Sequence, residues 1–291
     1  MFKGSFVALV TPFNGGKVDE AAYADLINWQ IENGTNGFVP TGTTGESATL
    51  TYEEHHKVVE LCVKYVNNRV PVIAGTGSNS TAEALELTRA ASASGADAAL
   101  VLTPYYNKPT QEGLYRHYMT IAEGAEIPLF VYDVPGRTAV EIAPGTLARV
   151  AAHERIIGLK DACAKLTKTA EVIALCGPEF TVLSGDDGLT LPMMAIGARG
   201  VISVTANVAP AEVAAMTGAA LAGDYARARE FHYLLREINE TLFIETNPIP
   251  GKTALAIMGR SREECRLPLC EMAQMNREKL TAVMRRLGVI E

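Results

Sequence analysis

The chain has 291 residues, of which 48% are hydrophobic, so it holds enough apolar material for one large domain or two ordinary ones. Its formal net charge is -7 and no stretch is rich in lysine or arginine, which excludes nucleic acid as an expected partner, because phosphate binding needs clustered positive charge. The five cysteines include no C-x-x-C pair, so we expect reduced thiols in a cytoplasmic protein and neither a disulfide framework nor a zinc site.

Short apolar runs alternate with amphipathic helical patterns along most of the chain. Eight runs are too short for helices and too continuously apolar for strands with one solvent face, which predicts parallel strands buried on both faces. The first run is also too short for a signal peptide or a membrane span, so we expect no membrane segment. The runs are Ser5–Val10, Gly37–Pro40, Pro71–Ala74, Ala98–Leu102, Pro128–Tyr132, Ile156–Lys160, Phe180–Ser184 and Gly200–Val204.

Helix signals lie between these runs. Thr51 and Ser80 each stand three residues before a glutamate, the pattern of a capping box, and Gly34 and Gly95 follow helical patterns where a left-handed cap is expected. Eight strand–helix units predict an α/β fold, a (β/α)8 TIM barrel over residues 1–223. A doubly wound open sheet is the structural alternative, because sequence does not show closure. Residues 224–291 predict a C-terminal helical appendage with helices over Tyr225–Phe243, Pro248–Met258 and Glu271–Arg286.

Lys160 ends one of the predicted strands, and in a barrel the chemistry lies where strands end. An amine at the end of a buried strand is partly desolvated, which favours its neutral form. A neutral amine attacks a carbonyl, and the resulting iminium draws electrons for carbon–carbon chemistry. Taken alone, a strand-end lysine more often reaches to water or pairs with a neighbour such as Asp161. The residues at the other strand ends therefore decide the interpretation.

These other strand-end residues suit a small keto acid. The glycines of Gly42-Thr43-Thr44-Gly45 allow a nest of backbone N–H groups, and the two hydroxyls add donors for a carboxylate. Tyr132 and Tyr106 could move protons near the lysine, and Arg137 could bind a carboxylate through two hydrogen bonds. Each feature has a plain structural alternative, namely an ordinary turn, rim packing or a surface salt bridge.

Metal and cofactor signals are weak. The segment 75–80 begins like a dinucleotide-binding loop, but Ser80 stands where the third glycine belongs. His55 and His56 are adjacent on a helix and face different directions. Asp186-Asp187 has no histidine nearby, and we expect it at a helix N-terminus, where the helix dipole favours carboxylates. We therefore expect no metal and no cofactor in catalysis.

Seven strings of this sequence, in order and with nearly unbroken spacing, resemble those of the dihydrodipicolinate synthases, within the N-acetylneuraminate lyase family of class I aldolases. The resemblance extends from Met1 through the helical tail. It implies condensation of pyruvate with L-aspartate 4-semialdehyde to 4-hydroxy-tetrahydrodipicolinate, in the diaminopimelate route to lysine. The strings are GTTGESATL (42–50), IAGTG (73–77), TPYYNKPTQEGLY (103–115), YDVPGRT (132–138), GLKDA (158–162), LSGDD (183–187) and GVISVTANV (200–208).

The resemblance implies a role for each matching residue. Lys160 would form the Schiff base with pyruvate, and Thr43, Tyr132 and Tyr106 would be the proton relay, with Tyr106 reaching in from a neighbouring subunit. Family members are usually homotetramers, each a dimer of dimers. The residues implied in substrate binding are Thr43 and Thr44 for the pyruvate carboxylate, Arg137 for the semialdehyde carboxylate, and Gly185 and Ile202 through backbone groups.

Two positions bear on regulation and on departures from the family. Asp133 stands where close relatives generally have asparagine, and since adjacent strand residues face opposite ways, we expect it to point out of the barrel with little catalytic effect. Tyr52 replaces a histidine often present in the lysine feedback site. Inhibition by L-lysine is a hypothesis carried by residues that match lysine-sensitive versions, namely Ser47, His55, Asn79, Glu83 and Tyr105.

Two other functions compete with this interpretation. A sibling aldolase acting on N-acetylneuraminate or a keto-deoxy sugar acid would share the lysine and the barrel, but such enzymes usually carry Ser-Thr in the first motif and lack the arginine at 137. A short substrate with a second carboxylate needs that cation, whereas a sugar needs hydroxyl partners. A keto-acid sensor is the second competitor, and the intact set of Thr43, Tyr106 and Tyr132 argues against it.

Overall fold

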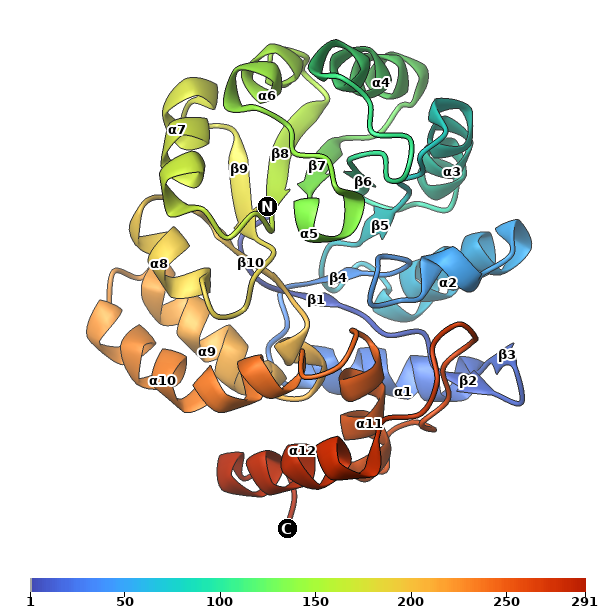
Figure 1. The fold of residues 1–291 in the computed structure, drawn as a ribbon, viewed down its shortest axis with the longest axis vertical. Helices are drawn as coiled ribbons and strands as arrows, with labels where there is room; N and C mark the ends of the chain where they lie inside the picture. Colours follow the sequence, from blue (N-terminus) through green and yellow to red (C-terminus); the bar gives the residue numbers. More distant parts are fainter. Residues whose placement is uncertain (1) are drawn as a thin grey trace.

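The computed structural model describes residues 2–291, in which eight parallel strands form one sheet surrounded by helices (Figure 1). An isolated bridge between Phe38 and Val72 joins β4 to the β5 side of the sheet, so the sheet closes on itself. The predicted (β/α)8 barrel is therefore confirmed, and the open-sheet alternative is wrong. In sheet order the strands are β4 Gly37–Val39, β1 Gly4–Ala8, β10 Gly200–Ser203, β9 Thr181–Ser184, β8 Ile156–Asp161, β7 Leu129–Asp133, β6 Ala98–Leu102 and β5 Ile73–Gly75.

Helices follow the strands and cover the outside of the barrel. Thr51 and Glu54 form the predicted capping box at the start of α2, and Gly34 and Gly95 have positive φ, as expected after α1 and α3. At Ser80 only half of the box forms, because the side chain accepts from Glu83 N. The helices of this layer are α1 Glu20–Glu32, α2 Tyr52–Val66, α3 Thr81–Ala93, α4 Gln111–Gly124, α6 Pro144–Ala151, α7 Leu166–Cys176, α8 Thr190–Ala195 and α9 Pro210–Leu221, and the short helix α5 Pro135–Thr138 lies after β7 at the strand ends.

The barrel separates two layers of core residues. Strand residues alternate, so one set fills the barrel interior and the other packs against the helices. Phe6, Phe130 and Ile202 belong to the interior set, together with Tyr132. The ring of Phe130 occupies the space where a Cβ at position 158 would lie. This explains why residue 158, two positions before Lys160 on the same strand, is a glycine. Apolar side chains therefore fill the barrel interior, and polar side chains occur only at the strand ends.

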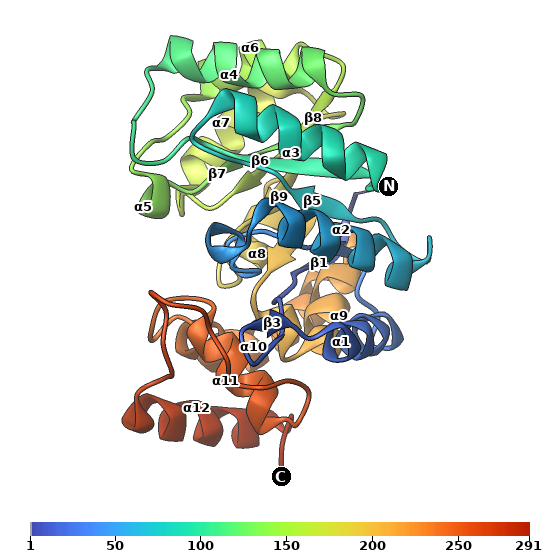
Figure 2. The same cartoon turned by 90° about the vertical axis from the view of Figure 1, so that its right-hand side faces the viewer.

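Three further helices lie beyond the barrel, as predicted: α10 Tyr225–Thr241, α11 Ile249–Ile257 and α12 Gln274–Leu287. Figure 2 shows α11 and α12 stacked at one end of the molecule, on the side of α1 and of the small hairpin β2 Phe13–Asn14 and β3 Lys17–Val18. The hairpin was not predicted, because two-residue strands carry no detectable period. Among residues 2–291, no helix is long and apolar enough to cross a membrane.

Candidate active site

Lys160 and Tyr132 lie side by side at the ends of two adjacent strands. The β7–β8 register pairs them directly, and the Lys160 Nζ atom lies 4.2 Å from the centre of the Tyr132 ring. Both side chains are only 7% exposed. The alternative in which Lys160 pairs with Asp161 is wrong, because that carboxylate accepts hydrogen bonds from the Thr169 hydroxyl at 2.7 Å and from the backbone N–H of Cys163 at 3.0 Å. The amine is left facing the barrel mouth.

The threonine loop follows β4 and lies at the same mouth. The nest that we expected from its glycines differs in detail, since Gly42 and Gly45 are not among the residues with positive φ, whereas Thr41 and Glu46 on either side are, at 52° and 54°. Gly45 is needed for a different reason, because a Cβ there would lie 3.0 Å from the Thr41 backbone nitrogen. Of the two adjacent threonines, Thr43 lines the cavity, whereas Thr44 is buried.

Arg137 lies on α5, directly after β7. Its Nη2 atom donates to the carbonyl oxygen of Asn247 at 3.4 Å, and the Nδ2 atom of Asn247 donates to the Thr44 hydroxyl at 3.0 Å. Asn247 thus joins the two groups predicted to bind carboxylates. Sequence reasoning missed it, because 203 residues separate it from Thr44 and no local pattern marks it.

A cavity of about 460 Å³ opens over this region. Its lining includes Thr43, Tyr132 and Arg137, so the structure brings these predicted residues together around one space. Gly185, directly after β9, and Ile202, on β10, are not among the lining residues: the backbone N–H of Gly185 donates to the carbonyl of Asp161 at 2.7 Å, and Ile202 is buried in the barrel interior. The volume suits a pair of small organic acids.

Two predicted catalytic residues are not part of the cavity lining: Lys160 lies behind it, against the ring of Tyr132, and Tyr106 is not brought to it by its own chain. Tyr106 lies in the loop after β6, has a φ of 71°, and is 90% exposed. A bulky aromatic side chain in the left-handed conformation and in solvent is unfavourable unless something outside the chain covers it. A single chain therefore holds two of the three residues predicted for the relay.

The candidate lysine site continues from the same cavity. Ser47, Glu83 and Tyr105 line it together with the buried His55, whereas Asn79 is absent from the lining and accepts a hydrogen bond through its carbonyl from Asn107. Burial lowers the pKa of His55 to about 4, although its Nε2 atom lies 2.8 Å from the Gly75 carbonyl oxygen. His55 is therefore neutral at pH 7, with Nε2–H as the donor to that carbonyl.

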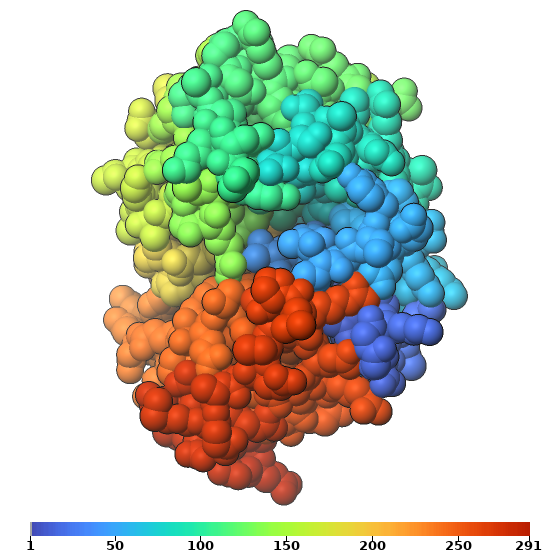
Figure 3. All heavy atoms as spheres, turned by 45° about the vertical axis from the view of Figure 1, so that its right-hand side comes forward, coloured from blue at the N-terminus to red at the C-terminus, as the bar shows by residue number. Residues whose placement is uncertain are grey.

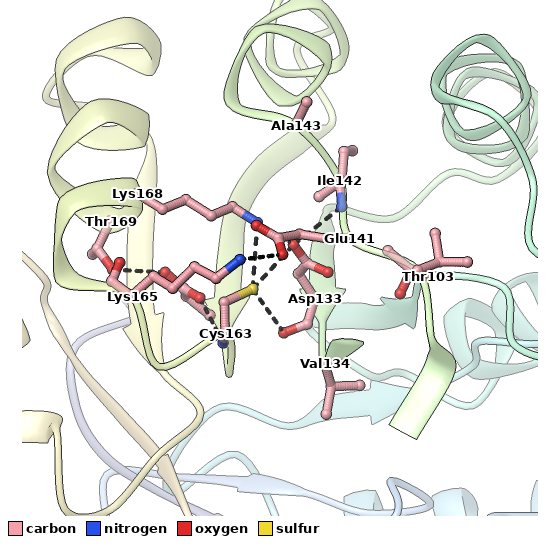
Figure 4. A network of polar contacts seen from close by, with 12 residues as sticks. Thr103, Asp133, Val134, Glu141, Ile142, Ala143, Cys163, Lys165, Lys168 and Thr169 are labelled. Atoms are coloured by element: carbon pink, nitrogen blue, oxygen red, sulfur yellow. Dashed lines mark hydrogen bonds and ion pairs between the residues drawn. The ribbon is translucent and has the colours of Figure 1, made fainter. Parts of the chain in front are cut away.

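Behind Tyr132, a network of polar side chains supports the ends of β7 and β8 (Figure 4). Asp133 points out of the barrel, as expected, and is fully buried; its carboxylate pairs with Lys168 Nζ at 2.5 Å and accepts from the backbone N–H of Ile142 at 3.2 Å. Lys168 also lies 3.2 Å from the Glu141 carboxylate. Burial raises the pKa of Asp133, and the ammonium of Lys168 opposes that rise.

Asp186 and Asp187 serve two different turns. Asp186 Oδ1 accepts from the backbone N–H of Leu189 just before α8, close to the predicted helix start. Asp187 does not act there: its carboxylate accepts from the Ser203 hydroxyl and from the backbone N–H of Val204 at 2.9 Å, which ties the loop after β9 to the end of β10. Within the described part of the chain, no cluster of three or more histidine, cysteine or acidic side chains could hold a metal ion.

Comparison with known proteins gives consistent matches over the whole chain. The model of the dihydrodipicolinate synthetase family matches residues 1–287. Proteins named 4-hydroxy-tetrahydrodipicolinate synthase from Thermodesulfovibrio yellowstonii and Geotalea daltonii are 59% and 56% identical over 291 and 290 residues, and each match covers 100% of both chains.

Solved structures agree with this result. The dihydrodipicolinate synthase of Aquifex aeolicus superposes with a TM-score of 0.98 at 51% identity, covering 99% of each chain. The chloride-inhibited enzyme of Acinetobacter baumannii, complexed with pyruvate, gives 0.98 at 46% identity over 100% of each chain. The enzyme of Cyanidioschyzon merolae with lysine bound gives 0.96 at 36% identity, covering 99% of each chain.

Proposed function

We propose that Lys160 carries the chemistry of this chain, which belongs to the dihydrodipicolinate synthetase family. The chain is a lyase of the class I aldolase type that condenses pyruvate with L-aspartate 4-semialdehyde to give 4-hydroxy-tetrahydrodipicolinate, in the diaminopimelate route to lysine. The observation that carries the assignment of Lys160 is its position: a buried amine at a strand end, 4.2 Å from the Tyr132 ring centre and without a carboxylate partner in residues 2–291.

The reaction begins when neutral Lys160 Nζ attacks C2 of pyruvate. The carbonyl oxygen leaves as water, and the iminium that remains makes the methyl protons of pyruvate acidic. Loss of one of these protons gives an enamine. Tyr132, which lies next to the amine, and Thr43, which lines the cavity, would pass the protons that these steps require. Thr43 and Thr44 would hold the keto-acid carboxylate.

The second half of the reaction forms the new bond and the ring. The enamine carbon attacks the aldehyde carbon of the semialdehyde, whose oxygen takes a proton and becomes the 4-hydroxyl. The amino group of the semialdehyde then attacks C2 and displaces Lys160, which closes the ring and returns the free amine. Arg137, held toward Asn247 at the cavity, would bind the carboxylate of the semialdehyde, and Gly185 and Ile202 would contribute backbone groups.

Tyr106 completes the relay only if a second copy of the chain supplies it. Its exposure and its absence from the lining of its own cavity support this placement, and with it a homotetramer built as a dimer of dimers. We place the enzyme in the cytoplasm. Residues 1–223 would form the catalytic barrel and residues 224–291 a C-terminal helical region.

L-Lysine would act as a feedback inhibitor in the same cavity. Ser47, His55, Glu83 and Tyr105 are among its lining residues, and the enzyme of Cyanidioschyzon merolae has lysine bound. Glu83 offers a carboxylate for an ammonium group, although it also accepts from the Ser78 hydroxyl at 2.7 Å. Initial rates at millimolar L-lysine test the proposal: inhibition that Glu83→Gln weakens supports it, and unchanged rates contradict it.

An initial-rate assay with pyruvate and L-aspartate 4-semialdehyde, coupled to a downstream reductase, tests the reaction itself. N-acetylneuraminate serves as the matched alternative substrate, because a sibling aldolase would cleave it to pyruvate. Turnover of the semialdehyde with no cleavage of the sugar is expected. Substitution of Arg137 by methionine should raise the KM for the semialdehyde by about ten- to a hundredfold with little change in the KM for pyruvate, because a charge-assisted pair to one substrate is lost.

A further inference from the structure

The threonine loop at residues 41–46 is held in an unfavourable backbone conformation. Thr41 and Glu46, at its two ends, are both in the left-handed region, which residues with a Cβ rarely adopt. Inside the loop, the backbone supplies two short turns, with Gly45 N donating to Gly42 O and Glu46 N to Thr43 O, each at 3.1 Å. Such a conformation persists only where surrounding groups hold it, so the support has to come from outside the loop.

Barrel residues give part of that support, since the Thr41 hydroxyl donates to the Gly75 carbonyl at 2.9 Å and the Thr11 hydroxyl to the Gly45 carbonyl at 2.7 Å. The Glu46 end of the loop is held by the C-terminal helical region. Lys252 on α11 is fully buried and forms an ion pair with the Glu46 carboxylate, while the backbone N–H of Arg266 donates to the other oxygen of the same carboxylate at 3.0 Å. Lys252 also donates to the carbonyl of Glu264 at 2.7 Å and lies 4.0 Å from the centre of the Phe13 ring. Two buried charges of opposite sign fix each other's position, because neither has water as an alternative partner.

Arg266 extends the connection to the helix that follows the loop. Its guanidinium donates to both carboxylate oxygens of Glu54 at 2.6 Å and to the Thr49 carbonyl at 2.9 Å. Asn247 adds the contact to the Thr44 hydroxyl described above. Figure 3 shows the result on the surface, where the red C-terminal residues lie directly against the blue N-terminal part of the chain. The C-terminal region therefore contacts Thr44 within the loop, Glu46 at its end, and Thr49 just beyond it.

We propose that Glu46 and Lys252 are positioning residues for the pyruvate step: through their buried ion pair, the C-terminal helical region sets the loop that presents Thr43 and Thr44 to the keto-acid carboxylate. This inference rests on the proposed function of the loop. It assigns to residues 224–291 a part in substrate binding that a barrel alone would not require. Glu46 is among the residues that line the cavity, but its carboxylate is bound to Lys252 and to the backbone of Arg266. Glu46 therefore acts through the backbone of the loop, and Lys252 acts through Glu46.

If the proposal is right, loss of the ion pair affects the KM for pyruvate far more than the KM for the semialdehyde, and this difference can be measured. In Glu46→Gln and Lys252→Met the loop loses its anchor, and the KM for pyruvate should rise about ten- to a hundredfold, since a misplacement of about 1 Å has effects of that size. The KM for the semialdehyde, measured at saturating pyruvate, should change less than about threefold, because Arg137 lies on α5 and outside the loop. If the two residues had a purely structural role, the variants would have a lower melting temperature, but the ratio of the KM for pyruvate to the KM for the semialdehyde would stay unchanged.

A double variant and a matched control complete the experiment. Glu46→Gln/Lys252→Met leaves no unpaired buried charge, so it should fold even where a single variant does not, and its pyruvate KM should still be raised. The control is Glu237→Gln/Arg286→Met, which removes an exposed ion pair between α10 and α12 that does not touch the loop; its KM values should match the wild type.

The outcome that would overturn this proposal differs from the outcome that would overturn the proposed function. A folded double variant with the pyruvate KM of the wild type would overturn it. Borohydride trapping of pyruvate on Lys160 is run in parallel on the wild type. If the wild type forms no adduct, the proposed function fails; if it does, and the double variant reaches half-maximal trapping at the same pyruvate concentration, only the role of Glu46 and Lys252 fails.

Discussion

At the residue scale, neighbouring positions on β7 and β8 have opposite tasks. Tyr132 and Lys160 face the barrel mouth, while the next residues along the chain, Asp133 and Asp161, face the helices. This alternation follows from the period of two in a strand. The outward carboxylates bind the strand ends to α7 and to the segment after α5. They therefore fix the backbone from which Tyr132 and Lys160 project.

The buried Asp133–Lys168 pair should be asymmetric to mutation. In Asp133→Asn, the lysine keeps Glu141 at 3.2 Å, and stability should fall by only about 1 kcal/mol. In Lys168→Met, the fully buried carboxylate loses its cation, and the free energy of unfolding should fall by about 3–5 kcal/mol. Denaturant unfolding of both variants and of the double variant measures this, and equal stability of the two single variants would contradict it.

Single residues could be predicted from the sequence where a strand end marked them. Lys160, Tyr132 and Arg137 follow apolar runs, and in the structure Tyr132 and Arg137 line the cavity while Lys160 lies against the Tyr132 ring. Asn247 and the pair Glu46–Lys252 could not be predicted, because their partners lie 203 and 206 residues away. Such contacts depend on how loops fold over the barrel, and no periodic pattern encodes that.

At the scale of elements, α2 links the loop to the C-terminal region. Arg266, through its hydrogen bonds to Glu54, lowers the pKa of that carboxyl to about 2 from 4.5. A carboxyl whose pKa is depressed by folding stabilises the protein fully above pH 4.5, and that stability is lost as the pH falls toward 2. The ionised form is therefore the one that joins α2 to residue 266.

This link gives a pH-dependent prediction. At pH 7, Glu54→Gln should lower the free energy of unfolding by about 2 kcal/mol, the order expected for a charged, partly exposed pair. The difference from wild type should shrink as the pH is lowered from 5 to 3, because the carboxyl takes up a proton there in the unfolded wild-type chain, while in the folded protein it stays ionised until the pH nears 2. Thermal unfolding at several pH values measures it. If the difference in the free energy of unfolding between wild type and Glu54→Gln stayed constant down to pH 3, the ion pair would not be its cause.

The elements themselves were largely predictable. All eight strands and the three C-terminal helices lie within a few residues of their predicted bounds, because each carries a clear apolar run or a helical period. The hairpin of β2 and β3 had only its Gly15-Gly16 turn as a signal. The left-handed residues of the threonine loop were misplaced, since glycine is the usual choice and Thr41 and Glu46 are held there by contacts instead.

At the scale of the whole molecule, an assembly would complete the site. If Tyr106 enters the cavity of a neighbouring subunit, two damaged chains should complement each other. A mixture of Lys160→Met, which keeps Tyr106, and Tyr106→Phe, which keeps Lys160, should recover activity after dissociation and reassembly. The sum of the separate activities is the baseline. No gain above it would show that each chain uses its own Tyr106.

The central claim is that Lys160 forms a Schiff base with pyruvate. The most direct measurement is to incubate the enzyme with pyruvate, reduce with borohydride, and locate the adduct by peptide mass spectrometry. We expect one reduced pyruvate moiety per chain, on the peptide that contains Lys160, and none in Lys160→Arg treated in the same way. An unmodified Lys160, or an adduct on another lysine such as Lys168, would contradict it.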